Sequence, residues 1–436
     1  MKFFTLFILT INLYATLQTI QVFDKLTLKP IKGAIISNES DKVFSDENGK
    51  ATIYKKKRNL YIKAAGYKQV DINATQNLVL LEPFTSKALY VSFWAAGSKR
   101  KMNQIINLAK KTEINTVIID VKNEFGNISY KTNVKLAQEI GAHKQRTVYH
   151  MDRLVKRLKK ANLYVIARIV VFKDNRLAKN KPEYSLKDLD TNQTWRNNEK
   201  LAWVDPFEEK VYDYVTDVAV DAASKGFDEI NFDYVRFPLK KNLSYKKNRN
   251  QKNRIQAVSD FLEMANKKLM KYNVYTSADT YGYVCWNTHD TNIGHTIGSL
   301  AKHVDYIAPM LYPSGFSRGV LGYKNPTDHP YEIINISLKQ ALNKSNISPL
   351  RLRPWIQSFK DYAFDRKFFR SREIGAQIKG AEDAGASGWL IWNPSSRFSS
   401  RGLQDVKNKY PVLIKSKYKI NDFCRRIDFP KEVSIP

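Results

Sequence analysis

Cysteine and metal-binding patterns are scarce in this chain of 436 residues. Its two cysteines, Cys285 and Cys424, exclude a disulfide-rich scaffold and a cysteine-based zinc module, and leave open whether the two pair. The six histidines show no HExxH motif or other metal-ligand spacing. We therefore expect neither a bound metal nor another cofactor.

Long apolar runs are also rare. Residues 3–15 form one, but a helix that spans a bilayer needs about 20 apolar residues. The run follows a basic start at Lys2 and ends on the small Ala15, which is typical of a signal peptide, with an uncleaved anchor as the alternative. We expect residues 1–15 to direct export to the periplasm or the cell exterior. No second run of spanning length follows, so we expect no stable membrane insertion after cleavage.

Acidic residues are few relative to basic ones. The chain has 72 Lys and Arg against 42 Asp and Glu, a formal charge of +30. Such a charge attracts polyanions, nucleic acid included. However, lysine greatly outnumbers arginine, and no nucleic-acid-binding motif is present. We expect no nucleic-acid partner and interpret most of this charge as solvated surface.

Two structured regions are expected in this chain, which is 43% hydrophobic and 12% aromatic. Residues 18–84 alternate apolar and polar side chains between closely spaced turns, which predicts a β-sandwich of about seven strands. The stretch 22–65 resembles the carboxypeptidase-regulatory-like sandwich of exported proteins, which implies a spacer or a recognition surface. Residues 406–436 are expected to form a basic tail.

The region 86–405 has the pattern of a (β/α)₈ barrel, also called a TIM barrel. Helical periodicity separates most of the expected strands; the clearest helix starts at a cap on Asp205 and ends at Gly226. Segments that leave the strands are longer than those that enter them, as in barrel enzymes. The eight apolar runs are 88–97, 116–123, 164–172, 229–237, 275–282, 304–313, 352–359 and 387–393.

Acidic side chains lie at the ends of the second, fourth and fifth expected strands. Period-two geometry places Asn231 with Asp233 on one face of the fourth strand. It likewise places Asp120, Lys122 and Glu124 on one face of the second. A carboxylate inside such a strand is costly unless it is paired or lies at the open mouth of the barrel.

Two carboxyl groups across one mouth suit the hydrolysis of a glycosidic bond, in which one is ionised and the other protonated. We predict Asp233 as the nucleophile and Asp279 as the acid/base, with Arg168 or Arg236 holding Asp233 ionised. Asp120 and Glu124 are the competing carboxylates, and structural ion pairs are the alternative for each acid.

Aromatic and amide side chains at the same rim suit the apolar faces and the hydroxyls of sugar rings. About half of the aromatic side chains at this rim are expected to belong to the core instead. The candidates for substrate binding, beside Asp120, Lys122, Glu124, Arg168, Asn231 and Arg236, are Tyr281, Tyr312, Trp355, Gln357, Trp392 and Asn393. Trp94, Trp195, Trp203, Trp286 and Trp389 complete the expected aromatic rim.

Several segments, in order, resemble a bacterial glycoside hydrolase domain of unknown function, a relative of the α-amylase-like barrels. They are 116–130, 164–188, 203–238 (ending GFDEINFDYVRFP), 304–316, 353–359 and 388–398 (GWLIWNPSSRF). The resemblance implies a TIM barrel and glycosidase activity, with Asp233 at the position of the nucleophile. Asp279 falls near the acid/base position, where those barrels have Glu, and Asn231 replaces an arginine.

Two functions follow. The first is an exported glycoside hydrolase that cleaves a polysaccharide. The basic stretch 240–254 is expected to overhang its site and to draw an acidic glycan from the cell envelope. The alternative is a non-catalytic glycan-binding protein on the same scaffold, favoured if Asp279 points into the helix layer. The oligomeric state stays open.

Overall fold

The computed structural model describes residues 17–54, 59–73 and 75–406. These residues belong to two compact units: residues 17–54, 59–64, 69–73 and 75–82 form the first, and residues 65–68 and 83–406 form the second. The expected signal peptide lies outside the described residues, as do the basic run 55–58 and the expected tail beyond Val406.

The first unit is all-β, as the alternating pattern predicts. Its described residues form seven strands in two sheets, one of three strands and one of four. Apolar side chains at alternating positions, such as Ile20 with Val22 and Leu60 with Ile62, are buried. The three-stranded sheet, in order, contains β4 (Lys50–Tyr54), β1 (Leu17–Asp24) and β7 (Leu78–Leu81), and the four-stranded sheet contains β3 (Lys42–Phe44), β2 (Ile35–Ser37), β5 (Leu60–Lys63) and β6 (Val70–Ile72).

The second unit is a closed barrel of eight parallel strands, which confirms the predicted TIM barrel. Each strand overlaps one of the eight predicted apolar runs. The strands, in barrel order, are β8 (Ser86–Val91), β9 (Thr116–Lys122), β10 (Tyr164–Val170), β12 (Glu229–Asp233), β14 (Tyr275–Tyr281), β15 (Tyr306–Met310), β16 (Trp355–Gln357) and β17 (Gly388–Trp392).

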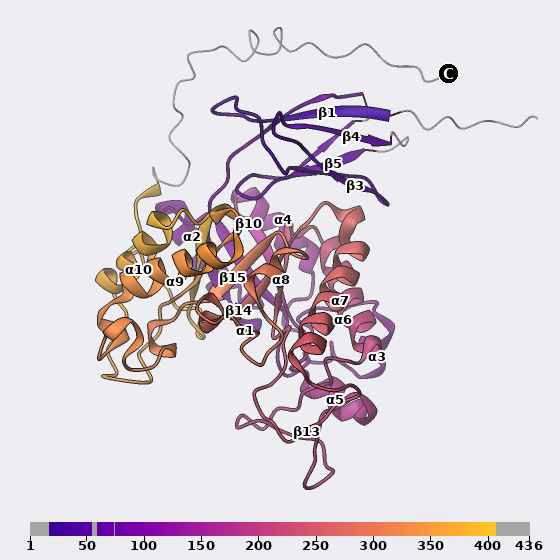
Figure 1. Ribbon diagram of the computed structural model, residues 1–436, viewed down its shortest axis with the longest axis vertical. Helices are drawn as coiled ribbons and strands as arrows, with labels where there is room; N and C mark the ends of the chain where they lie inside the picture. Colours follow the sequence, from indigo (N-terminus) through magenta and orange to yellow (C-terminus); the bar gives the residue numbers. More distant parts are fainter. Residues whose placement is uncertain (1–16, 55–58, 74, 407–436) are drawn as a thin grey trace, which may run out of the picture. The chain divides into compact units, whose positions relative to one another are not determined.

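Helices surround the barrel strands in Figure 1, with α6 beside α7 and α9 beside α10. The strands are apolar on both faces because one face packs on these helices and the other fills the barrel. The helices are α1 (Phe93–Ala96), α2 (Lys99–Lys111), α3 (Lys135–Glu139), α4 (Met151–Lys160), α5 (Asn175–Asn180), α6 (Glu209–Ser224), α7 (Gln251–Leu269), α8 (Ile297–Ala301), α9 (Pro330–Ser345) and α10 (Ser371–Asp383).

Two local predictions need correction. The first strand ends at Val91, so the residues that follow form α1 instead of a longer strand. Helix α6 begins at Glu209 with Glu208 as its cap, not at Asp205. The Asp205 carboxylate instead accepts the backbone N–H of Phe207 at 2.9 Å and that of Lys246 at 2.7 Å, so it holds the loop before the helix.

The long loops after the third and fourth barrel strands pair with each other. Strand β11 (Lys187–Asp188) lies antiparallel to β13 (Leu243–Ser244). This small sheet lies beyond the ends of the barrel strands, near α5 in Figure 1. The loops that follow β10 and β12 are thereby built as one layer at the carboxyl end of the barrel, where barrel enzymes form their sites.

Candidate active site

Asp233 is the last residue of β12 and is held by Arg168 from the neighbouring strand β10. The Arg168 Nε and Nη2 atoms both donate to Asp233 Oδ2, at 3.0 and 2.5 Å. The other oxygen, Oδ1, accepts the backbone N–H of Tyr234 at 2.6 Å. Both side chains are buried, so this fork of two N–H donors stabilises Asp233 as a carboxylate.

Arg168 also ties a second acid into the same cluster. Its Nη1 donates to Asp120 Oδ1 at 2.5 Å, and Tyr90 on β8 donates its hydroxyl to Asp120 Oδ2 at 2.5 Å. Burial raises the pKa of Asp120 above its usual range, against the lowering effect of Arg168. One guanidinium thus binds two carboxyl groups from adjacent strands, and Asp120 is the one whose oxygens are both occupied by side-chain donors.

Asp279 on β14 has a different environment. Its Oδ1 accepts hydrogen bonds from Asn231 Nδ2 and from Trp355 Nε1, each at 2.8 Å. Its Oδ2 makes no hydrogen bond with the described residues. Burial, with the negative charge of Asp233 as the next cause, raises the pKa of Asp279 well above its usual range. Of the carboxyl groups in this cluster, Asp279 is therefore the one whose surroundings most favour the protonated form, and Oδ2 is its oxygen without a hydrogen-bond partner among the described residues.

The chain turns sharply just after Asp233. Tyr234 has φ of +49°, in the left-handed region that residues with a side chain seldom adopt. Its N–H points back to the Asp233 carboxylate, and its own carbonyl accepts the N–H of Phe172 at 3.1 Å. The Asp233 carbonyl accepts the N–H of Val171 at 2.8 Å. The loop after β10 therefore holds the backbone of the turn, and the Tyr234 N–H holds the Asp233 side chain.

His295 braces the strands that carry the two acids. One ring nitrogen, Nε2, lies 2.8 Å from the Val235 carbonyl, and the other, Nδ1, lies 2.7 Å from the Thr280 hydroxyl. Burial lowers the pKa of His295 to about 4, so the ring is neutral: Nε2–H donates to the carbonyl and Nδ1 accepts from the hydroxyl. Val235 follows Asp233 by two residues and Thr280 follows Asp279 by one.

Aromatic rings close one side of this cluster. Trp392 stacks on Tyr90, with ring centroids 3.9 Å apart, and meets Trp355 edge-on at 5.3 Å. The Arg168 guanidinium lies 5.2 Å from the Trp392 centroid. Tyr312 is half-buried; burial first, then the charges of the two acids, raises the pKa of its hydroxyl well above the usual range. Trp392 and Tyr312 are the partly exposed rings of the cluster, available to a ligand.

The structure brings most of the predicted site residues to one end of the barrel. Glu124 is half-buried and close enough for its charge to raise the pKa of Asp120, so it lies at the edge of the cluster. The residues in contact within the cluster are Asp120, Arg168, Asn231, Asp233, Asp279, Trp355 and Trp392.

The predicted position of Lys122 is wrong, because its side chain does not share a face of the strand with Asp120. The strand register shifts after Asp120: Arg168 pairs with Asp120, and Ile169 pairs with Lys122. This β-bulge turns Lys122 toward the helices. Its ammonium binds Asp174 at 2.7 Å and the Val170 carbonyl at 2.7 Å, and lies 5.8 Å from the ring of Tyr214 on α6.

Four other candidates are held by neighbouring groups. Arg236 donates to Tyr281 at 2.7 Å and not to Asp233, so Arg168 alone of the two arginines pairs with Asp233. Gln357 is fully buried and binds both the N–H and the hydroxyl of Ser314. Asn393 accepts backbone N–H groups of its own turn and donates to the Ser358 carbonyl at 2.6 Å.

The remaining tryptophans have other surroundings. Trp389 is fully buried between the barrel and the helices, and Trp203 is buried within the loop after β10, with its ring centroid 5.6 Å from that of Tyr234. Trp286 is half-buried and donates to Ser337 on α9 at 2.9 Å, and Trp195 packs partly buried against the same core. Trp94 is 62% exposed on α1. Of the tryptophan candidates, Trp355 and Trp392 lie in the cluster.

Tyr90, Tyr234 and His295 are the site residues that the sequence reasoning missed. Tyr90 has the inward period-two position of the first strand, so the same rule that found Asp233 applies to it. No sequence signal identifies His295, because its partners lie 15 and 60 residues away along the chain.

Part of the basic stretch 240–254 is neutralised locally. Lys246 pairs with Glu208, and Arg254 pairs with Asp290 at 2.6 Å. Arg249 donates to the carbonyls of Pro238 and Asn292. Among the described residues, we find no cluster of three metal-ligating side chains, and no helix long and apolar enough to cross a membrane.

The fold defines the chain as a TIM barrel with a cluster of acids at one end, and a comparison with known families identifies its family. Residues 88–398 match the model of a family described as "Putative glycosyl hydrolase domain". The match covers well over half of the chain, so the chain belongs to this family. No curated protein matches it.

Two solved structures are similar to this chain. A hypothetical protein from Ruminiclostridium thermocellum is 36% identical, over 44% of this chain and 96% of its own, with a TM-score of 0.40. The PgaB (BpsB) glycoside hydrolase domain from Bordetella bronchiseptica is 13% identical, over 72% of this chain and 95% of its own, with a TM-score of 0.53. The second likeness supports the fold.

Proposed function

We propose that this chain is an exported glycoside hydrolase that cleaves a polysaccharide. The observation that carries the proposal is the difference between two carboxyl groups at one mouth. Asp233 is ion-paired to Arg168, whereas Asp279 is buried without a cation on its oxygens and has its pKa raised well above the usual range. Glycosidases need this division into an ionised and a protonated carboxyl group.

In the proposed reaction, Asp279 gives the proton on Oδ2 to the glycosidic oxygen as that bond breaks. Asp233 Oδ1, which accepts only the Tyr234 N–H, faces the positive charge that develops on the sugar carbon and acts as the nucleophile. The proton loss leaves Asp279 negative, and the donors on Asn231 and Trp355 stabilise that charge. Asp279 then accepts a proton from the water that completes hydrolysis.

The non-catalytic alternative is less well supported. An Asp279 side chain facing the helix layer would favour it, whereas the hydrogen bonds of Asp279 go to Asn231 and Trp355 inside the barrel. The rings of Trp392 and Tyr312 supply apolar surface for a sugar beside these acids. Export rests on the apolar stretch 3–15 and stays a prediction.

The test is a hydrolysis screen of the purified chain on peptidoglycan, uronate-containing glycans and host-type polysaccharides, followed by Asp233→Asn. We expect this variant to keep the fold and to lose turnover by at least about a thousandfold, the scale of losing a catalytic group. Asp217→Asn, which removes an exposed acid on α6, is the matched control and should stay active. Normal turnover by Asp233→Asn would refute the assignment.

A further inference from the structure

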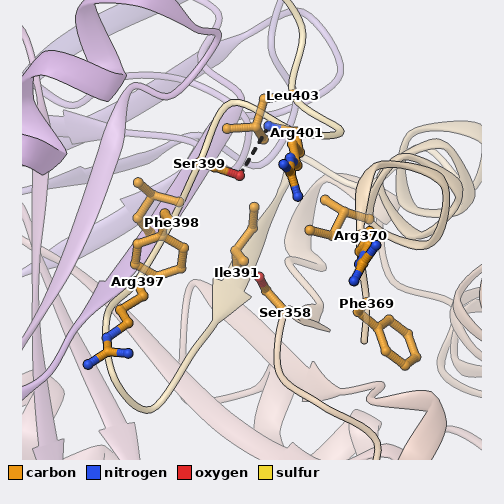
Figure 2. Close-up of a pocket in the computed structure, with 11 residues that line it drawn as sticks. Ser358, Phe369, Arg370, Ile391, Arg397, Phe398, Ser399, Arg401 and Leu403 are labelled. Carbon is orange, nitrogen blue, oxygen red and sulfur yellow. Dashed lines mark hydrogen bonds between the residues drawn. The ribbon is translucent and has the colours of Figure 1, made fainter. Parts of the chain in front are cut away.

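A cavity lies outside the cluster of acids, and its lining is cationic (Figure 2). It has a volume of about 150 Å³. It lies on the outer side of the barrel wall, because its floor includes Leu89 and Ile391, which belong to the core between strands and helices. Arg370, Arg397 and Arg401 are the charged residues of the lining, which contains no carboxylate.

The three arginines lack acidic partners. In the described part of the chain, none of them forms an ion pair, although buried acids elsewhere in the barrel are paired. Figure 2 shows Arg370 and Arg401 on neighbouring sides of the cavity, with the Arg397 guanidinium directed away from both. Like charges repel one another, so Arg370 and Arg401 are stabilised when an anion lies between them, with Arg397 adding to the positive potential of the lining.

The loop that carries two of these arginines is anchored at both ends. At one end, the Ser396 hydroxyl accepts the N–H of Ser92 at 2.9 Å. At the other, Gln404 exchanges hydrogen bonds with Glu113, N–H to carboxylate at 2.8 Å and carbonyl to N–H at 3.0 Å. Because the loop is already anchored, Arg401 is held over the cavity, and binding of a ligand there costs little additional conformational entropy of the chain.

Polar groups suited to an oxyanion complete the lining. Ser399 and Ser358 contribute hydroxyls, and Ser358 follows the seventh barrel strand directly. Arg370 caps the first turn of α10, a helix of 13 residues, so the positive end of the helix dipole adds to the charge of the arginines. Glu373 accepts the Arg370 N–H at 2.9 Å and does not line the cavity.

We propose that this cavity binds a tetrahedral oxyanion of the phosphate class. Guanidinium groups bind phosphate oxygens in pairs, and a dianion neutralises more of this charge than a carboxylate does. The loops after the seventh and eighth strands are also a recurrent phosphate-binding position in (β/α)₈ barrels. The source is either free phosphate or a phosphoryl group carried by a sugar.

The proposal goes beyond the hydrolase activity and is testable without it. Calorimetric titration of the purified full chain with inorganic phosphate should show saturable binding that weakens as NaCl rises. Arg401→Gln and Arg370→Gln should each weaken binding about tenfold or more, since each removes a charge-assisted contact. Circular dichroism would establish that both variants are folded.

Arg372→Gln is the matched control, because it removes an equal charge from the first turn of α10 at a position that does not line the cavity. No binding by the unaltered chain, or an equal loss with Arg372→Gln, would overturn the proposal. So would glucuronate binding as tightly as phosphate. Glucose 6-phosphate binding tighter than phosphate supports a phosphoryl sugar, and equal binding supports the free ion. Asp233→Asn should bind phosphate normally, which separates this test from that of the hydrolase.

Discussion

Trp355 controls how readily Asp279 ionises, and Trp355→Phe isolates that effect. The substitution keeps an aromatic ring in the barrel but removes the Nε1–H that lies 2.8 Å from Asp279 Oδ1. A hydrogen bond to a charged group contributes about 1.5–3 kcal/mol. Since one pKa unit corresponds to about 1.4 kcal/mol, the pKa of Asp279 should rise by about one to two units. The direction is upward because the lost donor favours the ionised form.

The assay is a pH titration of aspartate carboxyl carbons by ¹³C NMR on the labelled chain, with the Asp279 signal assigned by its absence in Asp279→Asn. This readout needs no substrate. If a hydrolysed glycan is identified, the alkaline limb of its pH profile should move in the same direction. Trp389→Phe is the control, since its Nε1 lies 3.5 Å from Glu382 outside the barrel interior. An Asp279 pKa that stays constant or falls in Trp355→Phe would refute the reasoning.

Two further predictions concern stability. The pKa of Asp279 is higher in the folded chain than in the unfolded one, so stability falls as pH rises from about 4 through the folded pKa, by up to about 1.4 kcal/mol per unit. Asp279→Asn should therefore be more stable than the unaltered chain at pH 7, and the difference in stability should shrink toward pH 4. Urea denaturation midpoints measured across this pH range test the prediction. A variant less stable than the unaltered chain at pH 7 would contradict it. Lys122→Met leaves the buried Asp174 carboxylate without its cation and should lower the free energy of unfolding by about 3–5 kcal/mol. Lys173→Met leaves only the exposed Glu199 unpaired and should cost markedly less in the same urea assay.

The barrel was predictable because its signals are local. Each strand is apolar on both faces, and the loops that leave the strands are long, so neither inference needs a long-range contact. Period two also placed Asn231 and Asp233 correctly on one inward face, because β12 is regular as far as Asp233.

The remainder of the site depends on irregular backbone. Lys122 was misplaced because the bulge after Asp120 leaves no mark in the sequence. The choice between Arg168 and Arg236 could not be made from spacing, since the left-handed Tyr234 ends the alternation just before Arg236. The sequence suggests that the Gln357 amide can bind a ligand, but this amide is hydrogen-bonded to a serine 43 residues away.

The outward Lys122 has a consequence for anyone who would re-engineer the mouth of this barrel. Lys122 from one strand and Asp174 from the loop after the next share a buried ion pair, and a side chain on Gly126 would place its Cβ 2.0 Å from Asp174 Oδ1. Arg176 then reaches back to Asn127, with Nη2 2.7 Å from Oδ1. These two loops therefore depend on each other. Grafting only one of them onto another barrel would leave Lys122 or Asp174 without its partner or bring a side chain at position 126 into contact with Asp174. Both loops should therefore be transferred together.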